Sequence, residues 1–108
     1  MPSSTHSLNL SALPVSDLSP LQGMPLDALF IPLTRVSDLS PLRGMALTYL
    51  DVSDTPVSDL SVLKGMPLKW LRCDFQRERD AELLRSLTTL EQINFKPAAE
   101  FWKEVDSK

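Results

Sequence analysis

The sequence predicts an α/β solenoid, in which similar units stack on one another and form a parallel β-sheet along one side. Three copies of a 21-residue unit support this prediction, because residues 15–35, 36–56 and 57–77 all begin with the letters VSDLS. The three glycines of the protein share one position of the unit, as Gly23, Gly44 and Gly65. A fixed period of this length is typical of repeat proteins, in which each unit buries its apolar edge against its neighbours.

Each unit contains a short predicted strand, marked by two apolar columns in the aligned copies. The first column comprises Leu8, Leu29, Leu50 and Leu71, and the second comprises Leu10, Ile31, Val52 and Cys73. Side chains two positions apart point to the same face of a strand, so both columns are predicted to face the core. Other recurring apolar positions complete the inward set, namely Leu26, Leu47, Leu68, Val15, Val36, Val57, Leu18, Leu39, Leu60, Leu21, Leu42 and Leu63.

The return segment of each unit is predicted to be a single 3₁₀ turn. In residues 19–21 and 40–42 (Ser-Pro-Leu) we expect the serine to cap the free amides and the proline to take the first helical position. A glycine follows within about four residues and is expected to end the turn in a left-handed conformation. Where the chain leaves the strand, the hydroxyls of Thr34 and Thr55 are expected to bond to nearby backbone groups.

A recurring acidic residue also occupies one position of the unit, as Asp17, Asp38 and Asp59. Aspartate accepts hydrogen bonds from backbone amides one or two residues further on, so turn formation explains this column. A calcium site needs several oxygen ligands, and one aspartate per unit supplies too few. We therefore predict no metal site and no cofactor.

The motif LxxLxL, followed by VSDLSPL and a Gly-Met pair, resembles the leucine-rich repeats, close to the short-helix class that includes the bacterial internalins. The repeat and the ending ERDAELLRSLTTLEQIN are similar to the C-terminal repeat tails of certain bacterial multidomain proteins, many of which carry a Ser/Thr protein kinase domain. Two features depart from the usual repeat: Thr34 and Thr55 replace asparagine, and Leu13 interrupts that column. The resemblance implies a leucine-rich-repeat solenoid with short 3₁₀ turns on its convex face. It also implies that the concave sheet is the binding surface.

The whole chain, residues 1–108, is predicted to form one leucine-rich-repeat domain. Residues 1–14 supply a partial first repeat, 15–77 the three full repeats, and 78–108 a helical C-terminal cap. In the cap we expect a helix of about ten residues containing Ala81, Leu84 and Leu87 on its inward face. We expect a last strand with Leu90 and Ile93, and a second helix starting at Pro97 whose Phe101, Trp102 and Val105 cover the core.

Residues 72–85 carry charges of both signs, and the N-terminal end of the array is incomplete. The mixed charges of residues 72–85, which include Asp80, are interpreted as a solvated helix face. The partial first repeat leaves an open strand edge, which favours pairing with further chain. We therefore expect this chain to be the C-terminal part of a longer array, or a shortened relative. The alternative is that MPSSTHS folds over the edge or that the edge is tolerated.

Composition and missing motifs exclude several classes of function. The net charge is −3 without clustered lysine and arginine, which argues against nucleic-acid binding. No apolar run approaches the roughly 20 residues that span a membrane, and no signal-peptide pattern is present. A single cysteine, Cys73, fits a reducing compartment, so we expect a cytoplasmic protein and a buried, unreactive thiol. Phosphate-loop and kinase motifs are absent and His6, in the N-terminal tail, is the only histidine, so we predict no enzyme.

The outward strand positions are the candidate functional residues. Tyr49 and Trp70 are predicted neighbours on adjacent strands, with Phe30 close by. An outward aromatic cluster with charged residues around it has the composition of a protein-binding hot spot. The predicted partner-binding residues are Phe30, Tyr49, Asp51, Lys69, Trp70, Arg72 and Asp74. The alternatives are that the rings only stabilise the sheet, or that the C-terminal helix folds over Trp70.

From these observations we expect a non-catalytic protein–protein interaction module, which binds a protein or peptide through the concave sheet. The runner-up follows from the resemblance to repeat tails. In that case the chain is a regulatory or spacer tail of a larger bacterial enzyme, such as a Ser/Thr protein kinase, with further domains upstream.

Overall fold

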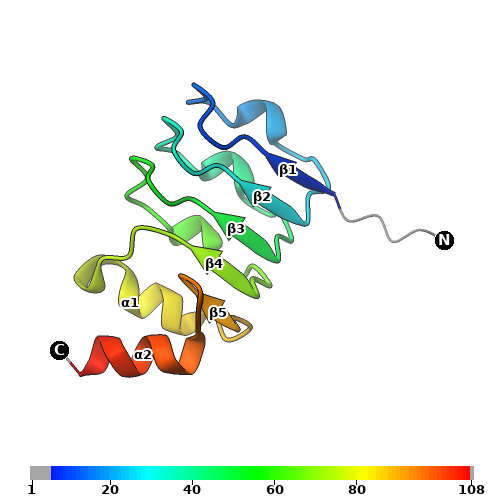
Figure 1. Ribbon diagram of the computed structural model, residues 1–108. Coiled ribbons are helices and arrows are strands. Elements are labelled where there is room, and N and C mark those ends of the chain that lie inside the picture. Colours follow the sequence, from blue (N-terminus) through cyan, green and yellow to red (C-terminus); the bar gives the residue numbers. More distant parts are fainter. Residues whose placement is uncertain (1–5, 108) are drawn as a thin grey trace.

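The computed structural model describes residues 6–107, which form a solenoid with its strands stacked along one side (Figure 1). One six-stranded sheet has the order β1-β2-β3-β4-β5-β6. Its strands are β1 (Ser7–Asn9), β2 (Ala28–Phe30), β3 (Tyr49–Asp51), β4 (Trp70–Arg72), β5 (Gln92–Ile93) and β6 (Lys96–Pro97). The pairs from β1 to β5 are parallel, and β6 pairs antiparallel with β5. This architecture confirms the predicted α/β solenoid with a parallel sheet.

The core lies between the sheet and the return turns, and the repeating apolar columns fill it. The sheet register pairs Leu29 with Leu50 and Leu50 with Leu71, and all three side chains are 0% exposed. The second column is buried from Ile31 onward. Burial of apolar side chains is the main favourable term in folding, and here it is repeated once per unit. The inward columns predicted from the repeat are therefore confirmed.

The return segments are 3₁₀ turns, as predicted: η1 (Ser19–Leu21), η2 (Ser40–Leu42) and η3 (Ser61–Leu63). The predicted serine cap is wrong, because each serine is the first residue inside its turn and makes no capping bond. Instead, the serine N–H donates to the Oδ1 atom of the aspartate two residues earlier, at 2.9 Å in every unit. This short-range bond is an aspartate's usual role at a turn, and it places the proline of η1 and η2 second rather than first.

The predicted turn-ending and bend-stabilising residues are confirmed. The three glycines have φ between 81° and 85°, a left-handed conformation that suits a residue without a Cβ atom. The Thr34 hydroxyl donates to the Ile31 carbonyl at 2.8 Å, and the Thr55 hydroxyl donates to the Val52 carbonyl at 2.6 Å. These bonds satisfy carbonyl groups where each strand bends away from the sheet.

The C-terminal cap contains the two expected helices, α1 (Arg77–Ser86) and α2 (Ala98–Asp106), which lie at the end of the stacked strands (Figure 1). Pro97 directly precedes α2, and Phe101 is buried against the core. Ile93 lies in the last parallel strand, whereas Leu90 lies just before it. The antiparallel strand β6 was not predicted, and it matters for the site described below.

One residue of the charged run is buried, which corrects the interpretation of 72–85 as a fully solvated face. Asp80 is 1% exposed and shares the inward stripe of α1 with Leu84, and Leu87 continues this stripe directly after the helix. Positions four and seven residues apart fall on one side of a helix, so the helical phase turns Asp80 inward. Its Oδ2 atom accepts a hydrogen bond from the Gln76 N–H, and its carboxylate forms an ion pair with Arg79.

At the opposite end, β1 pairs with β2, and Leu8 and Leu10 are half-buried. His6 is bound to the next unit, since its N–H donates to the Asp27 carboxylate and its carbonyl accepts from the Asp27 N–H. The idea that MPSSTHS folds over this edge concerns residues 1–5 for the most part, and these lie outside the described residues.

Candidate interaction surface on the sheet

The outer face of the sheet brings together the aromatic side chains that the repeat alignment places on neighbouring strands. The register aligns Tyr49 with Trp70, and Phe30 lies one strand further along. Neighbouring strands are about 4.8 Å apart, so large side chains in adjacent rows touch. The Trp70 ring centroid lies 6.2 Å from that of Phe30 and 6.3 Å from that of Tyr49. The expected three-ring cluster is therefore present in the fold.

A fourth ring, Phe95, joins this cluster from the turn between β5 and β6. Its centroid lies 5.7 Å from that of Trp70 in an edge-to-face arrangement. The Arg72 guanidinium lies 4.5 Å from the Phe95 centroid, a cation–π distance. We refer to Phe30, Tyr49, Trp70, Phe95 and Arg72 as the aromatic surface.

The repeat alignment missed Phe95 for a definite conformational reason. The register pairs Leu71 with Ile93, so a continued strand would place Phe95 in the inward column beside Cys73. Asn94 and Phe95 instead have φ values of 50° and 69° and form the two-residue connection of a hairpin. Such turns need left-handed residues and favour Asn followed by Gly. In the sequence, Asn94 is therefore a weak signal for this turn, and Phe95 gives no signal for it. The turn reverses the chain and sends Phe95 outward.

The rings are accessible to different degrees. Tyr49 is 45% exposed and Phe95 is 62% exposed, whereas Phe30, Trp70 and Arg72 are half-buried. Trp70 contacts the other three rings and so lies at the centre of the cluster. An exposed group of rings held by mutual contact presents a firm apolar area to solvent.

Asp51 does not belong to an exposed charged rim, which corrects its predicted position. It is only 8% exposed, and its Oδ1 atom accepts hydrogen bonds from both the N–H and the hydroxyl of Ser53. In the sheet it lies between Phe30 and Arg72, whose larger side chains flank the short aspartate. Asp51 therefore stabilises the end of its strand.

The other two predicted charged residues are exposed at the margin of the surface. The Asp74 carboxylate accepts a hydrogen bond from the Asp54 N–H at 2.8 Å. Lys69 directly precedes β4, and within residues 6–107 its ammonium group forms no ion pair or hydrogen bond. Lys69 and Asp74 are thus exposed charges of opposite sign that lie before and after β4 in the chain.

The C-terminal helix does not supply the ring that packs on Trp70. Its Trp102 contacts Phe75 and Phe101, with centroids 6.0 and 5.1 Å away, and lies 4.2 Å from the Arg85 guanidinium. These contacts seal the end of the core and leave Phe95 as the residue that reaches Trp70 from the cap. The alternative in which the helix folds over Trp70 is therefore wrong.

Cys73 and the side chains that could ligate a metal form no reactive or metal site within residues 6–107. Cys73 is 5% exposed, and burial raises the pKa of its thiol to about 12, which keeps it protonated and unreactive. In the described part of the chain, no three histidine, cysteine or acidic side chains converge as metal ligands. Within the same residues, no helix has the length and apolar character needed to cross a membrane.

Comparison with known proteins supports the fold. No protein-family model matches the chain, and no curated protein sequence matches it. The structure is similar to the crystal structure of an internalin from Listeria monocytogenes, with a TM-score of 0.56 and 20% sequence identity. The match covers 82% of this chain but only 40% of that internalin. At this identity the likeness shows the fold alone, an internalin-like leucine-rich-repeat solenoid, and it does not bear on a kinase-linked context.

Proposed function

We propose that this protein is a non-catalytic interaction module that binds a protein or peptide through the aromatic surface. The observation that carries the proposal is the continuous row of rings from Tyr49 through Trp70 to Phe95, in which the outer two are 45% and 62% exposed. Exposed apolar area gains free energy when a partner removes it from water. Contiguous exposed apolar patches on soluble proteins often mark such contacts.

The composition of the aromatic surface suits specific recognition of a partner as well as apolar contact with it. Tryptophan, tyrosine and arginine dominate the residues that carry binding energy at protein interfaces. The Arg72 guanidinium lies against the face of Phe95 and has five N–H donors, which can serve carbonyl or carboxylate groups of a partner. Phe30, Tyr49 and Trp70 stand on strands of a hydrogen-bonded sheet, and Phe95 stands on a tight turn, so little conformational freedom remains to be lost on binding.

The proposal can be tested with ligands selected for this chain from a library of displayed peptides. We expect Tyr49→Ala and Phe95→Ala each to weaken a selected ligand by roughly tenfold, because truncation of a hot-spot residue costs 1 kcal/mol or more. The melting temperature should fall by less than about 4 °C, since a cross-strand pair contributes roughly 0.2–1 kcal/mol.

Met24→Ala is the matched control, because Met24 is 40% exposed and follows η1 rather than lying on the sheet. The proposal fails if the ring variants keep full affinity, or if the Met24 variant loses as much. A large drop in melting temperature with unchanged affinity would instead assign the rings a packing role.

Two finer predictions rest on the sequence alone. A cytoplasmic location, and attachment to an upstream enzyme domain such as a Ser/Thr protein kinase, stay predictions. Reading the coding sequence upstream of this chain tests the second of them directly.

A further inference from the structure

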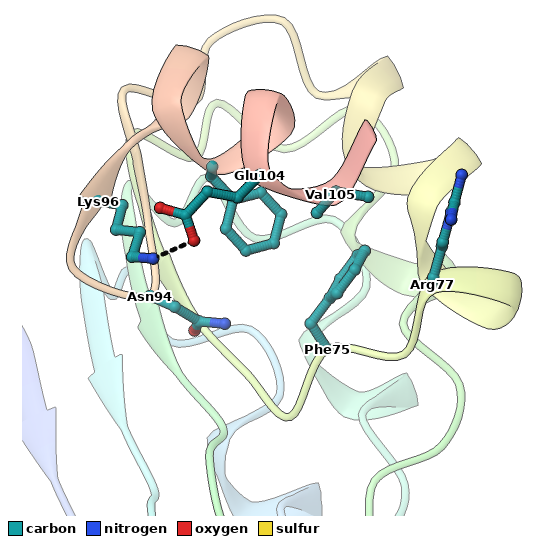
Figure 2. A pocket seen from close by; sticks show the side chains of 7 residues that line it. Phe75, Arg77, Asn94, Lys96, Glu104 and Val105 are labelled. Carbon is teal, nitrogen blue, oxygen red and sulfur yellow. Dashed lines mark hydrogen bonds and ion pairs between the residues drawn. The ribbon is translucent and has the colours of Figure 1, made fainter. Parts of the chain in front are cut away.

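A pocket of about 480 Å³ lies between α2, the β5–β6 hairpin and the segment that leads into α1 (Figure 2). Its apolar wall is formed by Phe75, Phe101 and Val105. The rings of Phe75 and Phe101 meet edge to face, with centroids 5.0 Å apart and an interplanar angle of 81°. Phe75 and Val105 are half-buried, so part of this wall faces the open space. A flat apolar group can pack against it.

A polar group with a fixed orientation faces the same space. The Oδ1 atom of Asn94 accepts a hydrogen bond from the Cys73 N–H at 2.9 Å. That bond requires the oxygen to face the backbone, so the NH₂ end of the amide points the other way. Figure 2 shows this nitrogen turned toward the pocket. Within residues 6–107 its two N–H donors have no protein acceptor.

Charged side chains line one side of the pocket and supply a further N–H donor. Lys96 and Glu104 form an ion pair across one side of it, as Figure 2 shows, and their side chains are 47% and 54% exposed. A lysine ammonium has three N–H donors, so it can hold Glu104 and a further acceptor together. Arg77 also lines the pocket. Asn94 and Lys96 thus present N–H donors to the same space, which suits a ligand with carboxylate oxygens.

We propose that this pocket binds the free C-terminus of a peptide that ends in an aromatic residue. The terminal ring packs on Phe75, Phe101 and Val105, and the terminal carboxylate accepts hydrogen bonds from Asn94 and Lys96. The volume favours a peptide over a free aromatic acid, because a cavity of about 150 Å³ already holds benzene. The remaining space accommodates the last peptide group. This site is distinct from the aromatic surface and is proposed independently of it.

The experiment is a nuclear magnetic resonance titration of the full, isotope-labelled chain with three probes. These are acetyl-glycyl-phenylalanine, its C-terminal amide, and phenylpropionate. We expect the acid dipeptide to cause saturable shifts of the Asn94 side-chain amide and of the Lys96 and Phe101 backbone amides. The amide should bind about tenfold more weakly because its charge-assisted hydrogen bonds are lost. Phenylpropionate should bind more weakly than the dipeptide because it lacks the peptide group.

Two lysine variants separate the pocket from general charge effects. Lys96→Met keeps an apolar stem but removes the ammonium, and we expect it to weaken the acid dipeptide about tenfold without affecting the amide. Lys103→Met is the control, since Lys103 is an exposed lysine of α2 that does not line the pocket.

Four results would overturn the proposal: no saturable shift at these residues, equal binding of the acid and the amide, equal effects of the two lysine variants, or equal binding of phenylpropionate and the dipeptide. The last result would assign the pocket to free aromatic acids. Each readout is a direct titration at the pocket, so its failure is separable from failure at the aromatic surface.

Discussion

Asp80 provides the sharpest test of how the C-terminal cap is held to the solenoid. Its carboxylate is 1% exposed and accepts a hydrogen bond from the Gln76 N–H at 2.9 Å. It also accepts two from the Arg79 guanidinium, at 2.7 and 2.8 Å. Substituting Asp80→Ala removes all three acceptor contacts. The helix-initiating N–H and a partly buried guanidinium are then left without this partner.

The expected loss can be estimated from these contacts. Breaking a fully buried ion pair costs about 3–5 kcal/mol, but the Arg79 side chain is 29% exposed and water replaces part of the interaction. Losing the acceptor at the start of a helix costs about 1 kcal/mol. Together these effects predict a loss of roughly 2–4 kcal/mol, a large part of the 5–15 kcal/mol typical of a domain.

The assay is urea unfolding followed by circular dichroism, with Asp106→Ala as the matched control. Asp106 also pairs with an arginine, Arg85, but its side chain is 55% exposed, so its removal should cost less than about 1 kcal/mol. Asp80→Asn retains an oxygen acceptor for the Gln76 N–H and should fall between the two. If Asp80→Ala costs no more than Asp106→Ala, burial of this carboxylate does not stabilise the cap as argued.

Three further predictions concern the repeats. Burial raises the pKa of the Cys73 thiol to about 12, so a thiol reagent should modify native Cys73 far more slowly than the urea-unfolded chain; equal rates would contradict this. Hydrogen bonds from Ser19 lower the pKa of Asp17 below its ordinary value of 3.8. The stability that this carboxylate contributes is therefore present above its unfolded pKa and is lost as the pH falls through its folded pKa. Urea midpoints should therefore drop in acid, and drop less for Asp17→Asn; an identical acid loss in both chains would argue against a contribution from Asp17. Leu33 is 61% exposed and has a φ of 60°, a left-handed conformation that asparagine tolerates better than leucine. Leu33→Asn should therefore raise the free energy of unfolding by roughly 1 kcal/mol. A lower melting temperature of this variant would contradict the prediction.

The repeating part of the fold could be predicted from the sequence because it depends on position within the unit alone. Leu29, Leu50 and Leu71 recur at the same phase, and stacking identical units buries all of them in the same way. The same logic placed Phe30, Tyr49 and Trp70 on one outward face. The aligned copies are enough to predict which side chains face the core, because each unit contacts only its neighbours and no distant contact has to be known.

The buried acids could not be predicted in this way. Asp51 looks like an outward strand residue, but its burial depends on the size of its two neighbours in the row and on the bonds to Ser53. Asp80 lies in a charged run, and its burial depends on the phase at which α1 docks. The burial of Asp51 follows from contacts between strands, which a pattern along one segment does not contain. The spacing of Asp80 to Leu84 is visible in the sequence, but only the fold shows that a carboxylate at this position finds a partner, Arg79.

The two-residue turn at Asn94 and Phe95 links the two proposed sites. Its first residue orients an amide toward the pocket, and its second packs a ring against Trp70. Had the strand continued with the repeat register, Phe95 would have entered the inward column and Asn94 would have aligned with Arg72. The aromatic surface would then lack its most exposed ring, and the pocket its fixed donor. Both candidate functions therefore depend on the point where the chain stops repeating. A departure from the repeat can place side chains at positions that the stacked units do not offer.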